Sequence, residues 1–144
     1  MTGLGYDFYT RRRLSKNNEN DASFLCRLFN FCREKYLLIK RKEEPVKDVY
    51  WVVGGRLRYK ETMAELAERV MMQEIGQSFS EFKIIGYSNY IFPDVPDARA
   101  THTPTLLHIV PVEKMFEPKI DNKHTDYIWS DKLPEEMLKQ TTWV

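Results

Sequence analysis

The spacing of hydrophobic residues along the chain changes at residue 62. From Thr62 to Gly76 the apolar side chains recur every three or four positions, which predicts an amphipathic helix. Thr62 and Glu65 have the spacing of a capping box, and Gly76 suits the position just after the end of a helix. The apolar positions of this helix are Met63, Leu66, Ala67, Val70, Met71 and Ile75.

Immediately before this helix, a run of aromatic and β-branched residues is followed by two glycines. Residues 49–53 have the composition of a strand. Gly54 and Gly55 then predict that the strand ends in a turn, because glycine accepts positive φ and allows close backbone approach. The predicted arrangement is a strand, a glycine turn and a helix that carries acidic residues. It is suited to hold a cation and a phosphate.

The rest of the chain alternates β-rich runs with turn signals. Residues 32–35 separate two such runs and predict a hairpin, and the prolines and aspartates of 93–97 predict a loop. A short helix over 133–139 is indicated by Pro134 near its start. The β-rich runs are residues 23–31, 36–41, 79–92, 105–112 and 127–129.

Length and composition indicate one globular domain. The chain has 144 residues, of which 42% are hydrophobic, and its formal net charge is +1. This balance gives no bulk attraction to nucleic acid but leaves a small anion such as a nucleotide open. No apolar run approaches the roughly 18 residues of a membrane span, and no signal-peptide core follows the N-terminus. We therefore expect a cytoplasmic protein that binds neither membrane nor nucleic acid.

Two regions are expected along the chain. Residues 1–22 are polar and irregular and predict a solvated lead-in, and residues 23–144 form the domain. Cys26 and Cys32 lack the spacing of a metal site, so we expect both to be reduced residues of the core or of strands.

The stretch from the glycine pair to Gly76 resembles the Nudix box, G-x5-E-x7-R-E-U-x-E-E-x-G-U, where U is aliphatic. The resemblance implies the Nudix fold, an α/β/α sandwich with a mixed sheet, and hydrolysis of a nucleoside diphosphate derivative with divalent cations. Val70 and Gln73 replace two of the three carboxylates that share one helical face in the full pattern, so only Glu74 remains. The matching positions are Gly55, Glu61, Arg69, Met71, Glu74 and Gly76.

Within that family, the chain is similar to the GDP-mannose mannosyl hydrolase branch. The segment that precedes the box in this branch is matched by Lys40-Arg41, Pro45 and Tyr50-Trp51. Residues 124–129 resemble its His-Asp-Asp-Tyr-Arg-Trp segment. Enzymes of this branch break the C1–O bond of the sugar in a nucleotide sugar, use a single Mg²⁺ and a histidine base, and form dimers. The resemblance therefore implies a homodimer with a nucleotide sugar as substrate.

The resemblance also assigns roles to particular residues. Arg41 and Arg56 would hold the diphosphate, because the arginine fork donates two parallel hydrogen bonds to phosphate oxygens. The Gly54 carbonyl and Glu74 would hold Mg²⁺, and His124 would activate water as general base. Arg56 and His124 are thus the expected catalytic residues. Glu61 and Arg69 would form a structural salt bridge between the loop and the helix.

Three further positions on the substrate side depart from the branch or match it in part. Lys123 replaces a glutamine that ligates Mg²⁺, and an ammonium has no lone pair to offer a metal. Either Lys123 contacts the diphosphate instead, or Asn122 or Asp121 ligates the metal. His102 falls on a loop histidine that contacts substrate. Thr103 replaces a tyrosine that helps the leaving group depart.

Two other classes of function stay open. A pyrophosphatase that breaks a P–O bond would need a second carboxylate from a loop. A nucleotide-sugar binding module without catalysis is also compatible with these replacements. In addition, Tyr6, Phe8 and Tyr9 of the lead-in could dock on a second subunit. The carboxylates available to a pyrophosphatase are Asp94, Asp97, Asp121 and Asp126.

Overall fold

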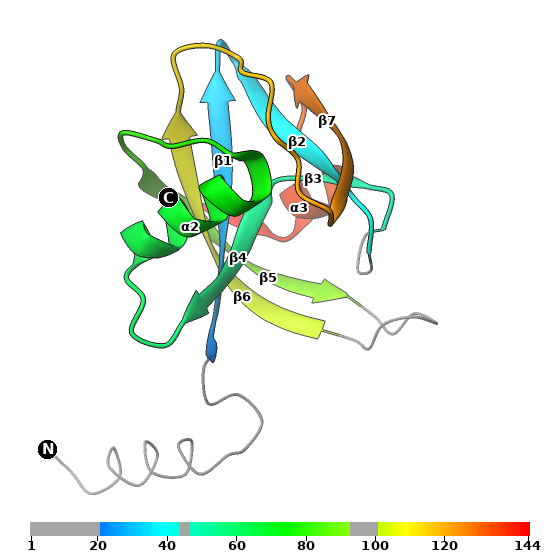
Figure 1. Cartoon of the computed structure of the whole chain (residues 1–144). Helices are drawn as coiled ribbons and strands as arrows, with labels where there is room; N and C mark the ends of the chain where they lie inside the picture. Colours follow the sequence, from blue (N-terminus) through cyan, green and yellow to red (C-terminus); the bar gives the residue numbers. More distant parts are fainter. Residues whose placement is uncertain (1–20, 44–46, 93–100) are drawn as a thin grey trace, which may run out of the picture.

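A computed structural model of the chain describes residues 21–43, 47–92 and 101–144 (Figure 1). Nearly all of the expected lead-in, with its Tyr6, Phe8 and Tyr9, lies outside these residues, as do the expected loop over 93–97 and its Asp94 and Asp97. No helix in the described ranges is long and apolar enough to cross a membrane.

The described residues form one eight-stranded mixed sheet. Its main path has the order β3-β2-β1-β6-β5-β8, with β4 paired to β1 and β7 paired to β2. The β1–β6 pair is parallel, and the other pairs are antiparallel. The strands are β1 (Asp21–Cys32), β2 (Lys35–Arg41), β3 (Tyr50–Trp51), β4 (Val53–Arg58), β5 (Lys83–Phe92), β6 (Thr101–Pro111), β7 (His124–Ser130) and β8 (Thr141–Trp143).

Two helices pack on the sheet in separate core clusters. Helix α2 (Met63–Ile75) contributes Leu66, Val70 and Met71 to a cluster with β1, β2 and β4 (Figure 1). Helix α3 (Glu135–Lys139) buries Met137 in a second cluster with Phe29 and Trp51. Alternate residues of β1 enter the two clusters, since successive side chains of a strand point to opposite faces. The result is the expected α/β/α sandwich with a mixed sheet.

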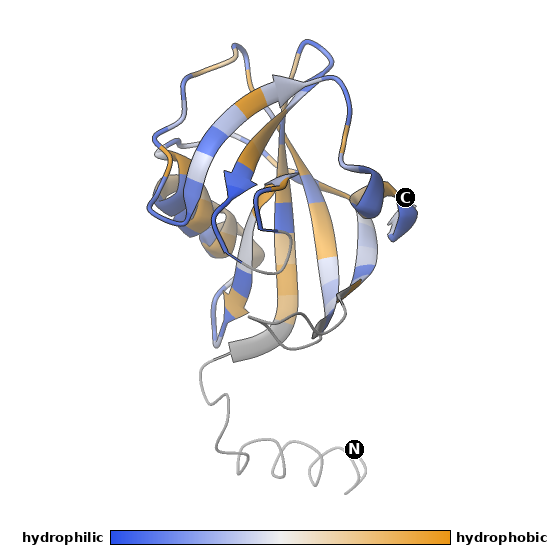
Figure 2. Ribbon diagram, turned by 90° about the vertical axis from the view of Figure 1, so that its right-hand side faces the viewer, coloured by the Kyte–Doolittle hydropathy of each residue, from blue (hydrophilic) through white to orange (hydrophobic). Residues whose placement is uncertain are grey.

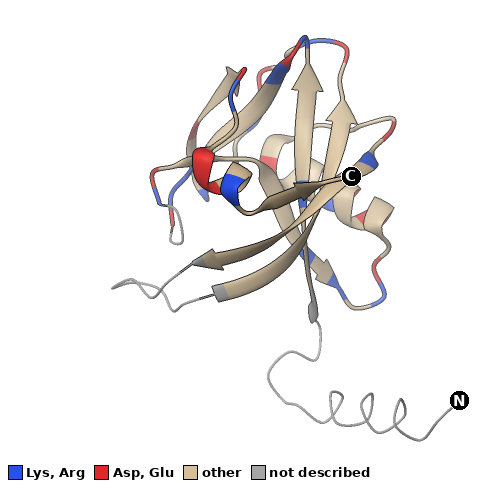
Figure 3. Ribbon diagram, turned by 180° about the vertical axis from the view of Figure 1, so that it is seen from behind, with Lys and Arg blue, Asp and Glu red and all other residues tan. Residues whose placement is uncertain are grey.

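Hydropathy follows these layers. The strands that cross the middle of the molecule are apolar over much of their length, and polar residues gather on the loops (Figure 2). Seen from behind, β5 and β6 carry almost no charge, whereas charged residues gather on α3 and on the loops (Figure 3). Charged side chains are therefore concentrated away from β5 and β6.

The ends of α2 confirm the helix that the apolar spacing predicts. Thr62 Oγ1 accepts a hydrogen bond from the Glu65 amide at 3.1 Å, and Glu65 Oε1 accepts one from the Thr62 amide at 3.2 Å. This reciprocal pair satisfies two amides that a helix start otherwise leaves without partners. Gly76 closes the helix in the left-handed conformation, with φ of 66°. The hairpin of β1 and β2 is also confirmed, and Cys26 and Cys32 are buried in β1, as expected for core residues of a strand.

The turn expected at the glycine pair is wrong. Strand β4 runs through Gly54 and Gly55 to Arg58, and Lys60, with φ of 64°, lies in the turn that follows. Close packing explains the glycines. An added Cβ at Gly54 would lie 2.3 Å from the Cys26 carbonyl oxygen, and one at Gly55 would lie 2.7 Å from a methyl group of Val70. These residues are therefore small because β1 and α2 approach them closely.

Candidate active site

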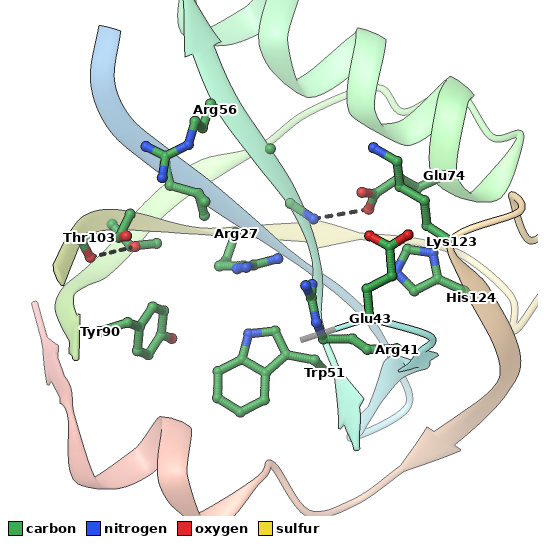
Figure 4. Close-up of a pocket in the computed structure, with 14 residues that line it drawn as sticks. Arg27, Arg41, Glu43, Trp51, Arg56, Glu74, Tyr90, Thr103, Lys123 and His124 are labelled. Carbon is green, nitrogen blue, oxygen red and sulfur yellow. Dashed lines mark hydrogen bonds between the residues drawn. The ribbon is translucent and has the colours of Figure 1, made fainter. Parts of the chain in front are cut away.

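A pocket of about 350 Å³ opens beside β4 and the C-terminal end of α2. Its volume falls within the range of small-molecule sites, roughly 300–1,000 Å³. Figure 4 shows its side chains converging from β1, β2, β3, β4, β5, β6, β7 and α2. The lining residues are Leu25, Arg27, Arg41, Glu43, Trp51, Gly54, Gly55, Arg56, Glu74, Tyr90, Thr103, Thr105, Lys123 and His124.

The two residues expected to bind a metal are neighbours in this pocket. The Gly54 amide donates a hydrogen bond to Glu74 Oε2 at 3.1 Å. Burial raises the pKa of Glu74 to about 7, against the opposing effects of the Arg27 charge and the Gly54 hydrogen bond. The Asp121 carboxylate adds to the rise. Glu74 is therefore a carboxyl group that titrates near neutral pH.

His124 is paired with an aspartate. Its Nδ1 lies 2.5 Å from Asp121 Oδ1, and the same oxygen accepts a hydrogen bond from the Lys123 amide at 3.2 Å. Burial lowers the pKa of His124, and Asp121 opposes this effect. A carboxylate at Nδ1 favours the tautomer whose Nε2 carries a lone pair. His124 can therefore accept a proton through Nε2 at neutral pH.

The segment that carries this pair is attached to the end of α2. The Lys119 amide donates to the Ile75 carbonyl at 2.9 Å, and the Asp121 amide donates to the Glu74 carbonyl at 3.3 Å. Carbonyls at a helix end have no partner within the helix, so the following segment supplies their donors. These bonds fix Asp121 and its partner His124 relative to Glu74.

Arg41 and Lys123 also lie at this end of the pocket. Arg41 is the register partner of His124 across β2 and β7, next to an irregularity in the ladder. The Lys42 amide donates to the Lys123 carbonyl at 3.0 Å, so the two strand ends are joined. The structure thus brings Arg41, Lys123 and His124 together.

Arg56 lies toward the opposite end of the labelled side chains, with Arg27 between it and Arg41 (Figure 4). Its side chain is exposed, while its carbonyl accepts a hydrogen bond from Arg69 Nη2 at 2.9 Å. Arg69 also binds Glu61 through two contacts of 2.7 and 2.9 Å. The expected Glu61–Arg69 salt bridge is therefore confirmed, and it supports the strand that presents Arg56.

His102 is not brought to the pocket. It lies on β6 rather than on the expected loop, opposite Ile91 of β5, and its side chain is exposed. Its neighbour Thr103 and then Thr105 line the pocket instead. Because residues of a strand alternate between faces, His102 points to the face away from the pocket.

Sequence reasoning missed Arg27. This residue lies on β1, between the buried Cys26 and Leu28, and its Nη1 donates to the Val52 carbonyl at 3.2 Å. An arginine inside the apolar run of residues 24–29 is the signal that could have identified it, because buried charges need a specific reason. Asp121 was considered only as a metal ligand or a source of a second carboxylate, whereas the structure pairs it with His124.

The donors around Glu74 do not suit the expected Mg²⁺. Magnesium takes six oxygen ligands in octahedral geometry, and in phosphate sites one or two carboxylates usually hold it together with water and substrate oxygens. Within residues 21–43, 47–92 and 101–144, no three His, Cys, Asp or Glu side chains are grouped to hold a metal. Asp121 is engaged with His124, and the exposed Asp126 accepts a hydrogen bond from the Tyr50 hydroxyl at 2.8 Å. The charges of Arg27 and Arg41 act on Glu74 and would oppose a bound cation, while Glu43 is the second carboxylate in the pocket lining.

Comparison with known proteins supports the fold. No protein-family model matches the chain, and no curated protein matches it. A MutT/Nudix family protein from Enterococcus faecalis has a TM-score of 0.62 and 18% identity over 90% of this chain, which spans only 50% of that protein. A MutT Nudix hydrolase from Burkholderia pseudomallei has a TM-score of 0.59 and 19% identity, covering 78% of this chain and 87% of that one.

The Nudix domain of Shewanella oneidensis NrtR, solved with ADP ribose, is a further structural neighbour. Its TM-score is 0.62 at 14% identity, and the match covers 90% of this chain and 82% of that one. At identities this low the likeness concerns the arrangement of the backbone. The chain has the Nudix fold.

Proposed function

We propose that the chain binds a nucleotide sugar in this pocket and hydrolyses it at C1 of the sugar, releasing the free sugar and a nucleoside diphosphate. The observation that carries the proposal is the His124–Asp121 pair beside Arg41 and Lys123. This arrangement combines a base for water with cations for a departing diphosphate. The ADP ribose bound by the NrtR domain is a ligand of the same chemical class.

His124 acts as the general base in this proposal. Its Nε2 takes a proton from water while the water oxygen forms a bond to C1. The bond between C1 and the β-phosphate oxygen breaks, and its electron pair leaves with the nucleoside diphosphate. Asp121 holds Nδ1 and stabilises the imidazolium that forms. A positioned base of this kind is worth roughly 10²–10⁴ in rate.

Arg41, Arg56 and Lys123 stabilise the leaving group. Fixed cations in a partly dry pocket stabilise charge as it develops, without reorganising during the reaction. The arginines give directional hydrogen bonds to phosphate oxygens, and Lys123 adds a charge that orients freely. Lys123 therefore serves the diphosphate in this proposal and is no metal ligand.

Attack at carbon is favoured over attack at phosphorus by the carboxylates. Cleavage of a P–O bond would require further acidic groups beside Glu74 to gather several cations. Asp121 and Asp126, the two candidates that the described residues include, are bonded to His124 and Tyr50. Attack at C1 uses only a base and a stabilised leaving group.

Mg²⁺ dependence is not part of the proposal, because the groups around Glu74 do not suit the ion. A homodimer and a cytoplasmic location stay predictions from the resemblance and from the composition. GDP-mannose is the first substrate to test, since the branch that the sequence resembles acts on it, and GDP-glucose is the second. ADP ribose carries its diphosphate on C5 of the terminal ribose, so it tests binding and cleavage at phosphorus only.

The position of isotopic label tests the reaction. GDP-mannose and GDP-glucose, whose diphosphate is attached at C1 of the sugar, are incubated with the protein in ¹⁸O-water, with EDTA or with excess Mg²⁺. We expect label in the free sugar and none in the nucleoside diphosphate. A nucleoside monophosphate with labelled phosphate would support the pyrophosphatase alternative. Binding of these compounds by calorimetry without turnover in either condition would identify a binding module.

A further inference from the structure

Arg27 is a cation in this pocket for which the reaction above has no role. It lies on β1 directly across from Gly54 of β4 and beside Leu107 of β6. A Cβ added at Gly54 would lie 2.7 Å from Arg27 Cδ and 2.8 Å from its Nη1. The arginine side chain therefore passes over Gly54 and fills the space that a larger residue there would occupy.

Gly54 is also the contact of Glu74. Its amide donates to Glu74 Oε2, so Arg27 and Glu74 meet at the same glycine, one from β1 and the other from α2 (Figure 4). The resemblance puts the Mg²⁺ between Gly54 and Glu74. In this chain the Arg27 guanidinium lies next to Gly54, with its Nη1 bound to the Val52 carbonyl, and its charge acts on Glu74.

The hydrogen bonds of Arg27 are incomplete. Its Nε is buried and has no hydrogen-bond partner in the described part of the chain. Burial lowers the pKa of Arg27 to about 10, so the side chain still carries its charge at neutral pH. An unsatisfied buried donor is unfavourable, so the site is not stabilised by Arg27 alone. The side chain is partly buried and lines the pocket, where phosphate oxygens can accept hydrogen bonds from its terminal nitrogens.

The charges that line the pocket also favour a bound phosphate group. Arg27, Arg41, Arg56 and Lys123 face two carboxylates, those of Glu43 and Glu74. Each phosphate of a diphosphate diester carries one negative charge. The protein's own cations are therefore sufficient to neutralise such a ligand without an added metal ion.

We infer that the Arg27 guanidinium takes the place of the divalent cation beside Gly54 and Glu74, so that this pocket binds the diphosphate of its ligand without Mg²⁺. The inference rests on the proposed function only in taking a diphosphate as the bound group. It assigns Arg27 as a binding residue, and it makes Gly54 the position that lets the guanidinium reach the diphosphate.

Calorimetry with two probes, GDP and inorganic pyrophosphate, tests this inference. We expect the wild-type protein to bind both in EDTA, with less than about a threefold change in Kd on adding excess Mg²⁺. Arg27→Met should weaken binding in EDTA by about 10- to 100-fold, because it removes a partly buried charge from the phosphate. Mg²⁺ should restore part of the lost affinity of Arg27→Met, since the site beside Glu74 is then open.

Two further variants separate this role from a general loss of structure or charge. Arg58→Met removes an exposed arginine from the same strand as Gly54, outside the pocket, and should leave both affinities unchanged. Arg27→Lys keeps the charge but loses the planar fork, so its affinity should lie between those of the wild type and Arg27→Met. Thermal unfolding of each variant, followed by circular dichroism, verifies that it is folded.

The results distinguish this inference from the proposed reaction. The inference is wrong if the wild type binds only with Mg²⁺. It is also wrong if Arg27→Lys and Arg27→Met are folded and keep wild-type affinity in EDTA. Hydrolysis at C1 would still stand in both cases. Metal-free pyrophosphate binding that depends on Arg27, with no turnover of any nucleotide sugar, would sustain the inference and overturn the reaction. Absence of binding to both probes in both conditions would overturn the two together.

Discussion

The two ends of helix α2 treat charge in opposite ways. At the N-terminal end, Glu61 and Arg69 form a two-point ion pair, and Thr62 and Glu65 satisfy each other's backbone amides. At the C-terminal end, Glu74 shares a pocket with more cations than carboxylates. We call these regions the braced end and the pocket end. The braced end neutralises its own charges, and the pocket end leaves an excess that an anionic ligand can neutralise.

The glutamates of the two ends show the difference directly. The hydrogen bond from Arg69 lowers the pKa of Glu61, whereas burial raises the pKa of Glu74 to about 7. Both residues lie beside the same strand, β4. The same side chain is therefore structural where its partner is complete, and suited to ligand chemistry where it is buried without a full partner.

The largest expected effect at the pocket end is loss of the base. His124→Gln should lower kcat for a nucleotide sugar by roughly 10²–10⁴, because no group remains to take the proton from water. Steady-state rates of sugar release, measured against a Thr125→Ala control on the same strand, provide the measurement. If His124→Gln retains more than a tenth of the activity, His124 is not the base.

The pH dependence of this reaction checks the Asp121 contact. Since burial lowers the pKa of His124, kcat of the wild type should fall only below the ordinary value of 6.5. Asp121 opposes that shift, so Asp121→Asn should move the acidic limb to still lower pH and reduce kcat with little change in KM. A limb that stays at its wild-type pH would mean that Asp121 does not act on the imidazole.

The next effect concerns stability at the pocket end. The pKa of Glu74 in the folded protein is raised from 4.5 to about 7, so folding favours the protonated form. The free energy of unfolding should therefore fall as pH rises from 4.5 to 7, by up to about 3 kcal/mol for this group. Glu74→Gln, a neutral mimic, should remove that fall.

Urea unfolding between pH 4.5 and 8 measures this difference, with Glu68→Gln on the exposed face of α2 as the matched control. Glu68→Gln should follow the wild-type pH dependence. Equal curves for Glu74→Gln and Glu68→Gln would show that Glu74 is solvated, which would remove the contrast between the two ends.

Substitutions at the braced end should change the free energy of unfolding and leave ligand binding unchanged. The Glu61 and Arg69 side chains are only 11% and 19% exposed, so their pair should be worth more than a fully solvated one, about 1–2 kcal/mol. A double-mutant cycle with Glu61→Gln and Arg69→Met, measured by urea unfolding at pH 7, gives the coupling energy. A coupling below about 0.3 kcal/mol would show that the brace is not energetically distinct.

Acid should weaken the brace. Because Arg69 lowers the pKa of Glu61 in the folded state, this stabilisation is present above the unfolded pKa and is lost as pH falls through the folded value. The direction is opposite to that expected for Glu74. Extending the urea series below pH 4.5 and including Glu61→Gln therefore compares the two ends within one experiment.

The smallest expected effect is at the helix cap. Thr62→Ala removes the acceptor of the Glu65 amide and should lower the free energy of unfolding by about 1 kcal/mol. Thr62→Ser keeps the hydroxyl and should remain close to the wild type. Affinity for GDP should be unchanged in both, and a loss of affinity in Thr62→Ala would mean that the two ends are coupled.

Local patterns in the sequence were sufficient to predict helix α2 and the residues at which it begins and ends. The period of the apolar residues, the capping box and the Gly76 stop all depend on contacts within a few residues, and the structure confirms each of them. The glycine pair was misread because its small size is required by Cys26 and Val70, which approach from other elements. Such contacts leave no mark in the local pattern.

The pocket end depended on pairings across the sheet. Arg27 reaches the site only because β1 lies beside β4, and His102 misses it because β6 presents Thr103 and Thr105 instead. The register between strands decides which face a residue occupies, and a single sequence does not specify that register. Arg41 and His124 were identified through the resemblance, which already contains the register of related proteins.

The C-terminal end of α2 also affects the position of residues outside the helix. Gly76 lies in the left-handed conformation, and an added Cβ there would stand 3.0 Å from Lys119 Cβ. Lys119 and Asp121 are bonded to the last carbonyls of α2, and Asp121 in turn orients His124. A methyl group at residue 76 would thus displace Lys119 and Asp121, and through Asp121 it would move the imidazole of His124. The orientation of the His124 ring therefore depends on the residue at which α2 ends.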